Sequence, residues 1–355
     1  MSEIKKGISL TFILMFLTNI TGILLTPFII SNLGNSEYGL YSLFGALVAT
    51  ISIFDFGLNN AVIRFVAKYK AENNKEKEEL FLGHIILLYI LVTVVISVVG
   101  FFVYNNLDDM FSNSLTQSEL SKGKDIFLIL VFNLAITLPG GVFSGICRGY
   151  EKYIIPQIVN ILRILIRAIL ILVLLKFGGD ALAIVILDTV LNITIISILA
   201  YYSLFKLKVR FSFNKLNLAF VKKIGRYSFW IFIFAITSQI QWEIGKVFVG
   251  TELDTSAVAV YAVGIMLGTY YSGFGAAISS VFLPKATQLV VADADVKKLT
   301  SVMITMGRII LLVLLFLLGG FIHLGESFIN LWLGEAYQNS WRIALIIMVV
   351  FTISL

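Results

Sequence analysis

The sequence predicts an all-α polytopic membrane protein built as two parallel six-helix bundle repeats, with the second bundle incomplete here. Composition is the first observation: 59% of the residues are hydrophobic, only 14% are charged, and the mean hydropathy is +0.95. Soluble domains average about 45–50% apolar and about 25% charged residues. The second observation is that apolar runs long enough to cross about 30 Å of hydrocarbon recur along the chain. The third is that the order of these runs repeats.

The first predicted span, Gly7–Ile30, is a retained membrane helix. It is too long for the apolar region of a cleaved signal peptide, and no small-x-small cleavage site follows it. A final span begins near Ile343 and reaches the last residue, Leu355. Between them the apolar runs predict the spans Tyr38–Ile63, Phe81–Tyr104, Ile126–Cys147, Ile154–Leu175, Ala181–Phe205, Tyr227–Phe248, Val258–Phe282 and Leu299–Ile322.

The basic residues set the orientation of these spans. Most lysines and arginines fall in alternate loops, whereas the opposite loops carry only Lys122, Lys124, Lys176 and Arg342. The positive-inside rule then places the N-terminus in the cytoplasm. The formal charge of +6 is therefore an orientation signal, with contact to membrane lipids as a possible extra, and nucleic acid is not an expected partner.

The two halves of the chain repeat the same order of spans and loops. Tyr41 and Phe54 match Tyr261 and Phe274 at an offset of 220 residues. Six spans return the chain to its starting side, so the repeats are parallel, and a binding site is expected between them. The predicted organisation is a first bundle over 1–205, a basic cytoplasmic connector over 206–226, and an incomplete second bundle over 227–355 with three full spans and the start of a fourth.

Motifs of enzymes and nucleotide-binding proteins are absent from the sequence. It contains no P-loop, no HExxH and no GxSxG. The two histidines, His84 and His323, are expected near opposite membrane faces, and Cys147 has no partner for a disulfide. We therefore expect no enzyme, no catalytic residues, no metal and no cofactor.

Two arginines near the middle of an apolar span are the strongest functional signal. Arg163 and Arg167 are four residues apart, so both project from one face of a helix, and Asn160 extends that face. An arginine at the centre of a bilayer costs at least about 2.5 kcal/mol. These side chains should therefore face a polar cavity, or alternatively be locked to acidic residues on neighbouring helices.

Other spans carry further polar residues. Lys246 and Arg308 join the arginines as candidate substrate-binding cations, while Asp55, Asp188 and Glu243 are candidate carboxylates for ion coupling. Plainer interpretations stay open: Glu243 and Lys246 could neutralise each other, Asp188 could reach water at the outer surface, and Asp55 could serve helix packing. The excess of deep cations favours an anionic substrate, and the planar fork of arginine suits phosphate.

Short motifs then suggest a family. Leu33-Gly34-Asn35-Ser36-Glu37-Tyr38-Gly39-Leu40-Tyr41, followed by Phe54-Asp55-Phe56-Gly57-Leu58 and Ala61-Val62-Ile63-Arg64-Phe65, resembles the polysaccharide (O-antigen type) flippases of the multidrug/oligosaccharidyl-lipid/polysaccharide exporter superfamily. The stretch from Tyr227-Ser228-Phe229-Trp230 through Ala259-Val260-Tyr261 resembles the opening of their second bundle.

This resemblance implies twelve to fourteen helices and a central cationic cavity. It implies that the protein flips undecaprenyl-diphosphate-linked oligosaccharide repeat units across the bacterial cytoplasmic (inner) membrane by alternating access, with polysaccharide assembly proteins as possible partners. Two alternatives stay open: a cation-coupled small-molecule or drug exporter of the same superfamily, and a membrane enzyme of envelope polysaccharide synthesis.

Overall fold

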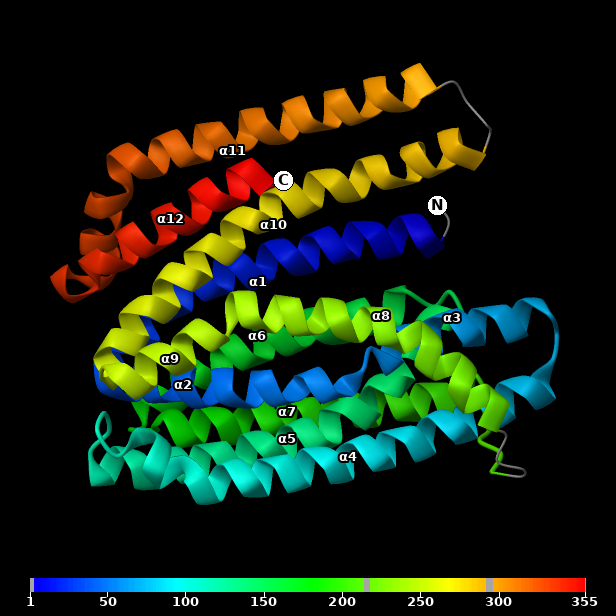
Figure 1. Ribbon diagram of the computed structural model, residues 1–355, viewed down its shortest axis with the longest axis horizontal. Helices are drawn as coiled ribbons and strands as arrows, with labels where there is room; N and C mark the ends of the chain where they lie inside the picture. Colours follow the sequence, from blue (N-terminus) through cyan, green and yellow to red (C-terminus); the bar gives the residue numbers. More distant parts are fainter. Residues whose placement is uncertain (1–2, 214–217, 292–295, 355) are drawn as a thin grey trace. The chain divides into compact units, whose positions relative to one another are not determined.

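The computed structural model describes residues 3–213, 218–291 and 296–354, and every element within these ranges is a helix (Figure 1). The predicted all-α fold class is therefore confirmed. Nine helical segments of the described chain are long and apolar enough to cross a membrane. The protein is accordingly a multi-pass membrane protein.

One predicted span, Tyr227–Phe248, differs from the others. Helix α8 (Leu218–Trp242) ends before α9 (Ile244–Glu252) begins, and Glu243 lies between them. The described apolar part, Phe229–Trp242, is shorter than a membrane span. Residues 214–217 of the predicted connector lie outside the described residues.

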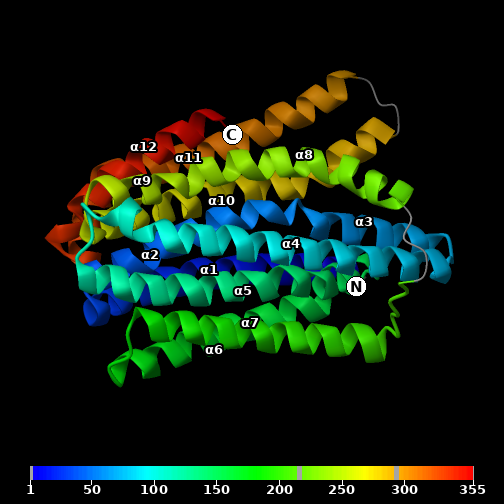
Figure 2. The same ribbon diagram turned by 60° about the horizontal axis from the view of Figure 1, so that its bottom comes forward.

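Contacts divide the chain into two compact units, Met1–Thr255 and Ser256–Leu355. In the first unit, α5 (Gln117–Gly149) is the central helix. It packs mainly against α2 (Asn35–Ile51), α3 (Leu58–Ala71), α4 (Lys75–Phe111) and α7 (Ala181–Tyr201). Figure 2 shows α4, α5 and α7 running side by side.

Aromatic side chains fill the space between α2, α4 and α5. The ring of Phe44 lies 6.0 Å from that of Phe111 and 6.4 Å from that of Phe127, centroid to centroid. All three side chains are fully buried. Gly123 allows this packing, because a Cβ at that position would lie only 2.1 Å from the Phe44 ring.

The remaining helices of the first unit surround this core. Helix α1 (Glu3–Leu33) pairs with α6 (Ile154–Lys176), and α6 also packs on α7. A π-helix, η2 (Tyr202–Lys206), extends α7. Helix α8 packs on α3, and α9 packs on α2. Both helices therefore belong to the first unit.

The second unit contains most of α10 (Thr255–Val291), together with α11 (Val296–Leu333), the 3-10 turn η3 (Glu335–Tyr337) and α12 (Gln338–Ser354). Gly264 and Gly268 of α10 give room to isoleucines of α12. The starts of α2 and α10 lie 220 residues apart in the chain, and those of α4 and α11 lie 221 apart. These separations match the predicted offset, while the two-bundle organisation stays a prediction.

Candidate functional site

The two predicted arginines lie in the interior of the first unit. Arg163 and Arg167 project from α6 toward α7 and α2, where Asp188 and Tyr41 are close enough to act on both guanidinium groups. We call these four residues the arginine cluster. The i,i+4 spacing thus placed both arginines on one face, as predicted, and that face meets protein.

The two arginines differ in how they are held. The Nε of Arg167 donates to Asp188 Oδ1 at 2.5 Å and its Nη2 donates to Oδ2 at 2.9 Å, a two-pronged ion pair. Arg163 has no such partner: its Nε is buried and has no hydrogen-bond partner among the described residues. The alternative interpretation, in which the arginines are locked to acidic residues on neighbouring helices, therefore holds for Arg167 but not for Arg163. The cluster holds two cations against one anion.

Apolar side chains of α6 and α7 pack beside the arginine cluster. Ile171 and Leu175, one and two turns beyond Arg167 on α6, are buried against Ile184 of α7. Tyr41 packs against the same group. Beside this packing the side chains of Arg167 and Asp188 are only 28% and 16% exposed, so their electrostatic interaction is stronger than it would be in water.

The other predicted site residues do not all join this cluster. Asn160 donates its Nδ2 hydrogen bond back to the Pro156 carbonyl at 2.9 Å. Lys246 donates to Glu243 at 2.8 Å, three residues away, so these two neutralise each other. Arg308 is an exposed residue of α11 in the second unit. Asp55 lies at the end of a 3-10 turn, η1 (Ser52–Asp55), between α2 and α3.

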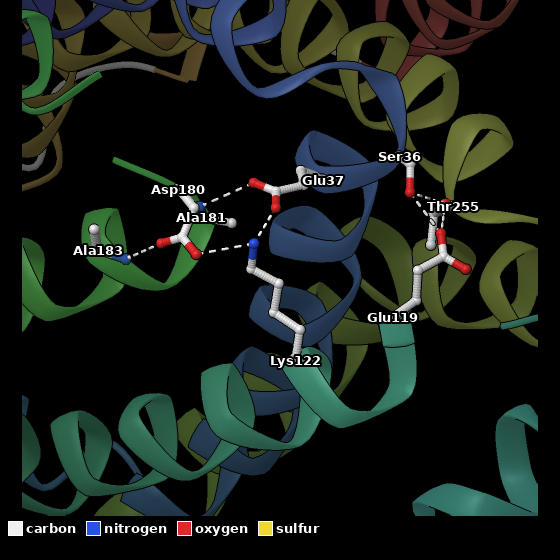
Figure 3. A network of polar contacts seen from close by, with 8 residues as sticks. All are labelled: Ser36, Glu37, Glu119, Lys122, Asp180, Ala181, Ala183 and Thr255. Carbon is white, nitrogen blue, oxygen red and sulfur yellow. Dashed lines mark hydrogen bonds and ion pairs between the residues drawn. The ribbon is translucent and has the colours of Figure 1, made fainter. Parts of the chain in front are cut away.

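A second polar cluster joins the starts of α2, α5, α7 and α10 (Figure 3). In its first part, the Glu119 carboxylate accepts hydrogen bonds from the hydroxyls of Ser36 at 2.5 Å and Thr255 at 2.8 Å. It also accepts from the N–H of Thr116 at 2.9 Å, closing a capping box at the start of α5. One carboxylate thus lies at three helix N-termini, where the helix dipoles favour negative charge.

In its second part, Lys122 binds the carboxylates of Glu37 and Asp180 together. Asp180 caps α7 by accepting from the Ala183 N–H at 3.0 Å. Burial alone would raise the pKa of the Asp180 carboxyl, but hydrogen bonds from Lys122 and Ala183 hold it below its usual value. We call Ser36, Glu37, Glu119, Lys122, Asp180 and Thr255 the helix-start network.

The helix-start network was not predicted from the sequence. Thr116-Gln117-Ser118-Glu119 carries the capping-box pattern and could have located the start of α5. The contact between Glu119 and Thr255, 136 residues apart, has no comparable local signal. A Cβ on Gly39 would lie 1.7 Å from the Thr255 carbonyl oxygen, so this glycine permits the close approach.

The chain matches a known protein family. A model described as "Polysaccharide biosynthesis protein" matches residues 4–290. The chain belongs to this family. The resemblance drawn from the sequence motifs is therefore confirmed. A curated relative, the uncharacterized membrane protein EpsK of Bacillus subtilis (strain 168), is 24% identical over 347 residues. The match covers 92% of this chain and 66% of EpsK, so the chain spans slightly less than two thirds of that relative.

Solved structures of other proteins share the fold of this chain. An inward-facing multidrug resistance MATE family transporter of the MOP superfamily matches with a TM-score of 0.69 and 17% identity, over 94% of this chain and 74% of that one. An outward-facing transporter of the same description gives 0.66 and 17%, over 98% and 80%. A MATE protein in complex with MaL6 gives 0.66 and 17%, over 99% and 80%. At this identity the likeness shows a shared fold.

Proposed function

We propose that this protein flips lipid-linked oligosaccharide repeat units across the bacterial cytoplasmic membrane by alternating access, with its N-terminus in the cytoplasm. The substrate is an undecaprenyl diphosphate that carries the glycan. Family membership supports polysaccharide biosynthesis as the process, and the fold shared with MATE transporters supports movement of a substrate across the membrane. On this proposal the protein is a transporter without catalytic residues.

The observation that carries the proposal is the buried Nε of Arg163, which has no hydrogen-bond partner among the described residues. A cation in a membrane span is costly unless an anion lies beside it. The single carboxylate of the cluster is already engaged by Arg167 through both oxygens. A diphosphate would supply the missing negative charge, and its oxygens would accept two parallel hydrogen bonds from the Arg163 fork.

The test compares substitutions along one helix. The full-length gene is expressed in a strain that lacks its polysaccharide flippase, and surface glycan is measured together with membrane expression. Arg163→Gln should lower surface glycan at least about tenfold, which corresponds to about 1.4 kcal/mol of lost interaction. Arg163→Lys keeps the charge without the fork and should retain part of the activity.

Lys176→Gln is the matched control, because Lys176 is an exposed cation at the end of the same helix, outside the cluster. It should leave surface glycan unchanged. Normal surface glycan from a well-expressed Arg163→Gln variant would contradict the proposed diphosphate site. Arg167 is a poorer target, since its removal leaves Asp188 without its partner and would affect folding.

A second candidate function is export of small molecules. The specific observation in its favour is the shared fold with multidrug resistance transporters. It predicts that expression raises resistance to cationic compounds and leaves surface glycan unrestored. A drug-susceptibility panel on the same strains separates the two candidates.

A further inference from the structure

A break in the helix backbone lies inside one candidate membrane span. The span Asn35–Ala71 contains α2, η1 and α3, and between η1 and α3 two consecutive residues are left-handed. They are Phe56, with φ 52°, and Gly57, with φ 65°. A bulky residue in this conformation costs about 1–2 kcal/mol. Within a membrane, irregular backbone is tolerated where it is buried in protein or lines a cavity.

Packing against α8 stabilises the break. The Phe56 ring lies 4.6 Å from the ring of Phe232, centroid to centroid. Ile231 covers Gly57 so closely that a Cβ there would lie 2.3 Å from its side chain. Gln239 donates to the Ser52 hydroxyl at 3.2 Å. The irregular turn is therefore a built feature, held in place by contacts from a neighbouring helix.

The carboxylate at this break has no cationic partner among the residues that the structure describes. Asp55 is half-buried, and the groups acting on it from the described helices around it are the Tyr89 side chain and the Gly57 backbone. The other two candidate coupling carboxylates are paired: Asp188 with Arg167 and Glu243 with Lys246. An ionised carboxylate removed from water without such a partner is strongly destabilised.

Tyr89 of α4 provides the second, independent observation. Its side chain is only 1% exposed, and its hydroxyl has no hydrogen-bond partner of acceptable geometry among the described residues. The hydroxyl nevertheless lies beside Asp55, close enough to act on it. A buried hydroxyl left unpaired costs about 1–3 kcal/mol, and a ligand between the two groups would remove that cost.

We propose that the break between α2 and α3 is a binding site for one monovalent cation, a proton or Na⁺, which neutralises Asp55. This rests on the proposed transporter function, for which it supplies the coupling site. A proton converts Asp55 to a neutral acid that can hydrogen-bond to the Tyr89 hydroxyl. Na⁺ takes the same oxygens as ligands, together with backbone carbonyls that an interrupted helix leaves available.

The test measures cation binding without any substrate. The full-length protein is purified in detergent, and its Tm is followed first against Na⁺ at fixed pH, with choline chloride holding the ionic strength, and then against pH without Na⁺. A bound cation stabilises the folded protein and should raise Tm by about 2–5 °C. Asp55→Asn should lose this response. Glu243→Gln should keep it, since Glu243 is already paired.

The result identifies the cation. A Na⁺ response lost in Asp55→Asn supports a sodium site, and a pH response lost in the same variant supports a proton site. No response to either in the wild type, or an equal response in Asp55→Asn, overturns the proposal. If Asp55→Asn does not fold, Tyr89→Phe decides: about tenfold weaker binding of Na⁺ or protons supports the site, and unchanged binding overturns it.

Failure of this proposal is distinguishable from failure of the proposed function. Arg163→Gln should lose glycan export while its Tm still responds to the cation. Export that depends on Arg163 in a protein with no cation response would leave the flippase proposal standing and remove the cation site. A cation response without glycan export in any strain would support the cation site and remove the flippase proposal.

Discussion

The helix-start network and the arginine cluster place similar charges in the same unit, yet they are balanced differently. In the helix-start network, Lys122 lies between two carboxylates, and Glu119 accepts from three hydroxyls and a backbone N–H. In the arginine cluster, Asp188 satisfies Arg167, and the buried Nε of Arg163 has no hydrogen-bond partner in the described part of the chain. Both are built from acidic and basic side chains between helices.

The difference separates polar groups that hold helices together from those available to a ligand. A satisfied network fixes helix ends and has no capacity left for another partner. An unbalanced cluster retains a charge that something else must neutralise. The same contrast holds for carboxylates: Asp188 and Glu243 each pair with a cation, whereas Asp55 has none beside it within the described residues. Substitutions in the two regions should therefore differ in kind.

The largest effect on stability is expected from Asp188→Asn. It leaves Arg167 as a second uncompensated cation, and breaking a buried ion pair from one side costs about 3–5 kcal/mol. The measurement is the free energy of unfolding in detergent. The double variant Arg167→Met with Asp188→Leu removes both charges and should recover most of this loss. Equal instability of the single and double variants would show that the pair itself, rather than its balance, stabilises the unit.

The arginine cluster also shows which features the sequence could predict and which it could not. Helical periodicity placed Arg163 and Arg167 on one face, and the spacing of Glu243 and Lys246 suggested their pairing, because both relationships lie within a few residues. The partner of Arg167 depends on which helix packs against α6. Tertiary packing decides this, so the sequence alone did not identify Asp188 as that partner. The left-handed Phe56 was unpredictable for the same reason: contacts from α8 stabilise it.

Gly39→Ala should have the next largest effect, in the helix-start network. The new methyl group would meet the Thr255 carbonyl oxygen, so α2 and the start of α10 must move apart, at a cost of about 1–3 kcal/mol. Gly45→Ala is the matched control in the same helix, where nothing lies within 4 Å of the added atom. That control should be stabilised by about 0.5–1 kcal/mol through helix propensity. Thermal unfolding of both variants provides the comparison, and equal Tm values would refute the close approach.

Lys122→Met tests whether the network depends on its central cation. Removal of Lys122 leaves Glu37 and Asp180 facing each other without a positive charge between them, and we expect a loss of about 1–2 kcal/mol. The control is Lys124→Met, because Lys124 pairs with the more exposed Asp108. An exposed pair contributes at most about 1 kcal/mol, so the control should change little. Glycan export per folded molecule should be unchanged in both, in contrast to Arg163→Gln.

The smallest predicted effect is a dependence of stability on pH that arises from Asp180. The pKa of this carboxyl is lowered in the folded protein, so its ionised form stabilises the fold above the usual carboxyl pKa of about 3.9. That contribution is lost as the pH falls through the folded pKa. Since the side chain is 41% exposed, solvent screening keeps the contribution small. Asp180→Asn can still cap α7 but carries no charge, so its Tm should fall less steeply than that of the wild type below about pH 4. Parallel pH profiles would mean that the Asp180 charge contributes nothing and that its cap alone holds the start of α7.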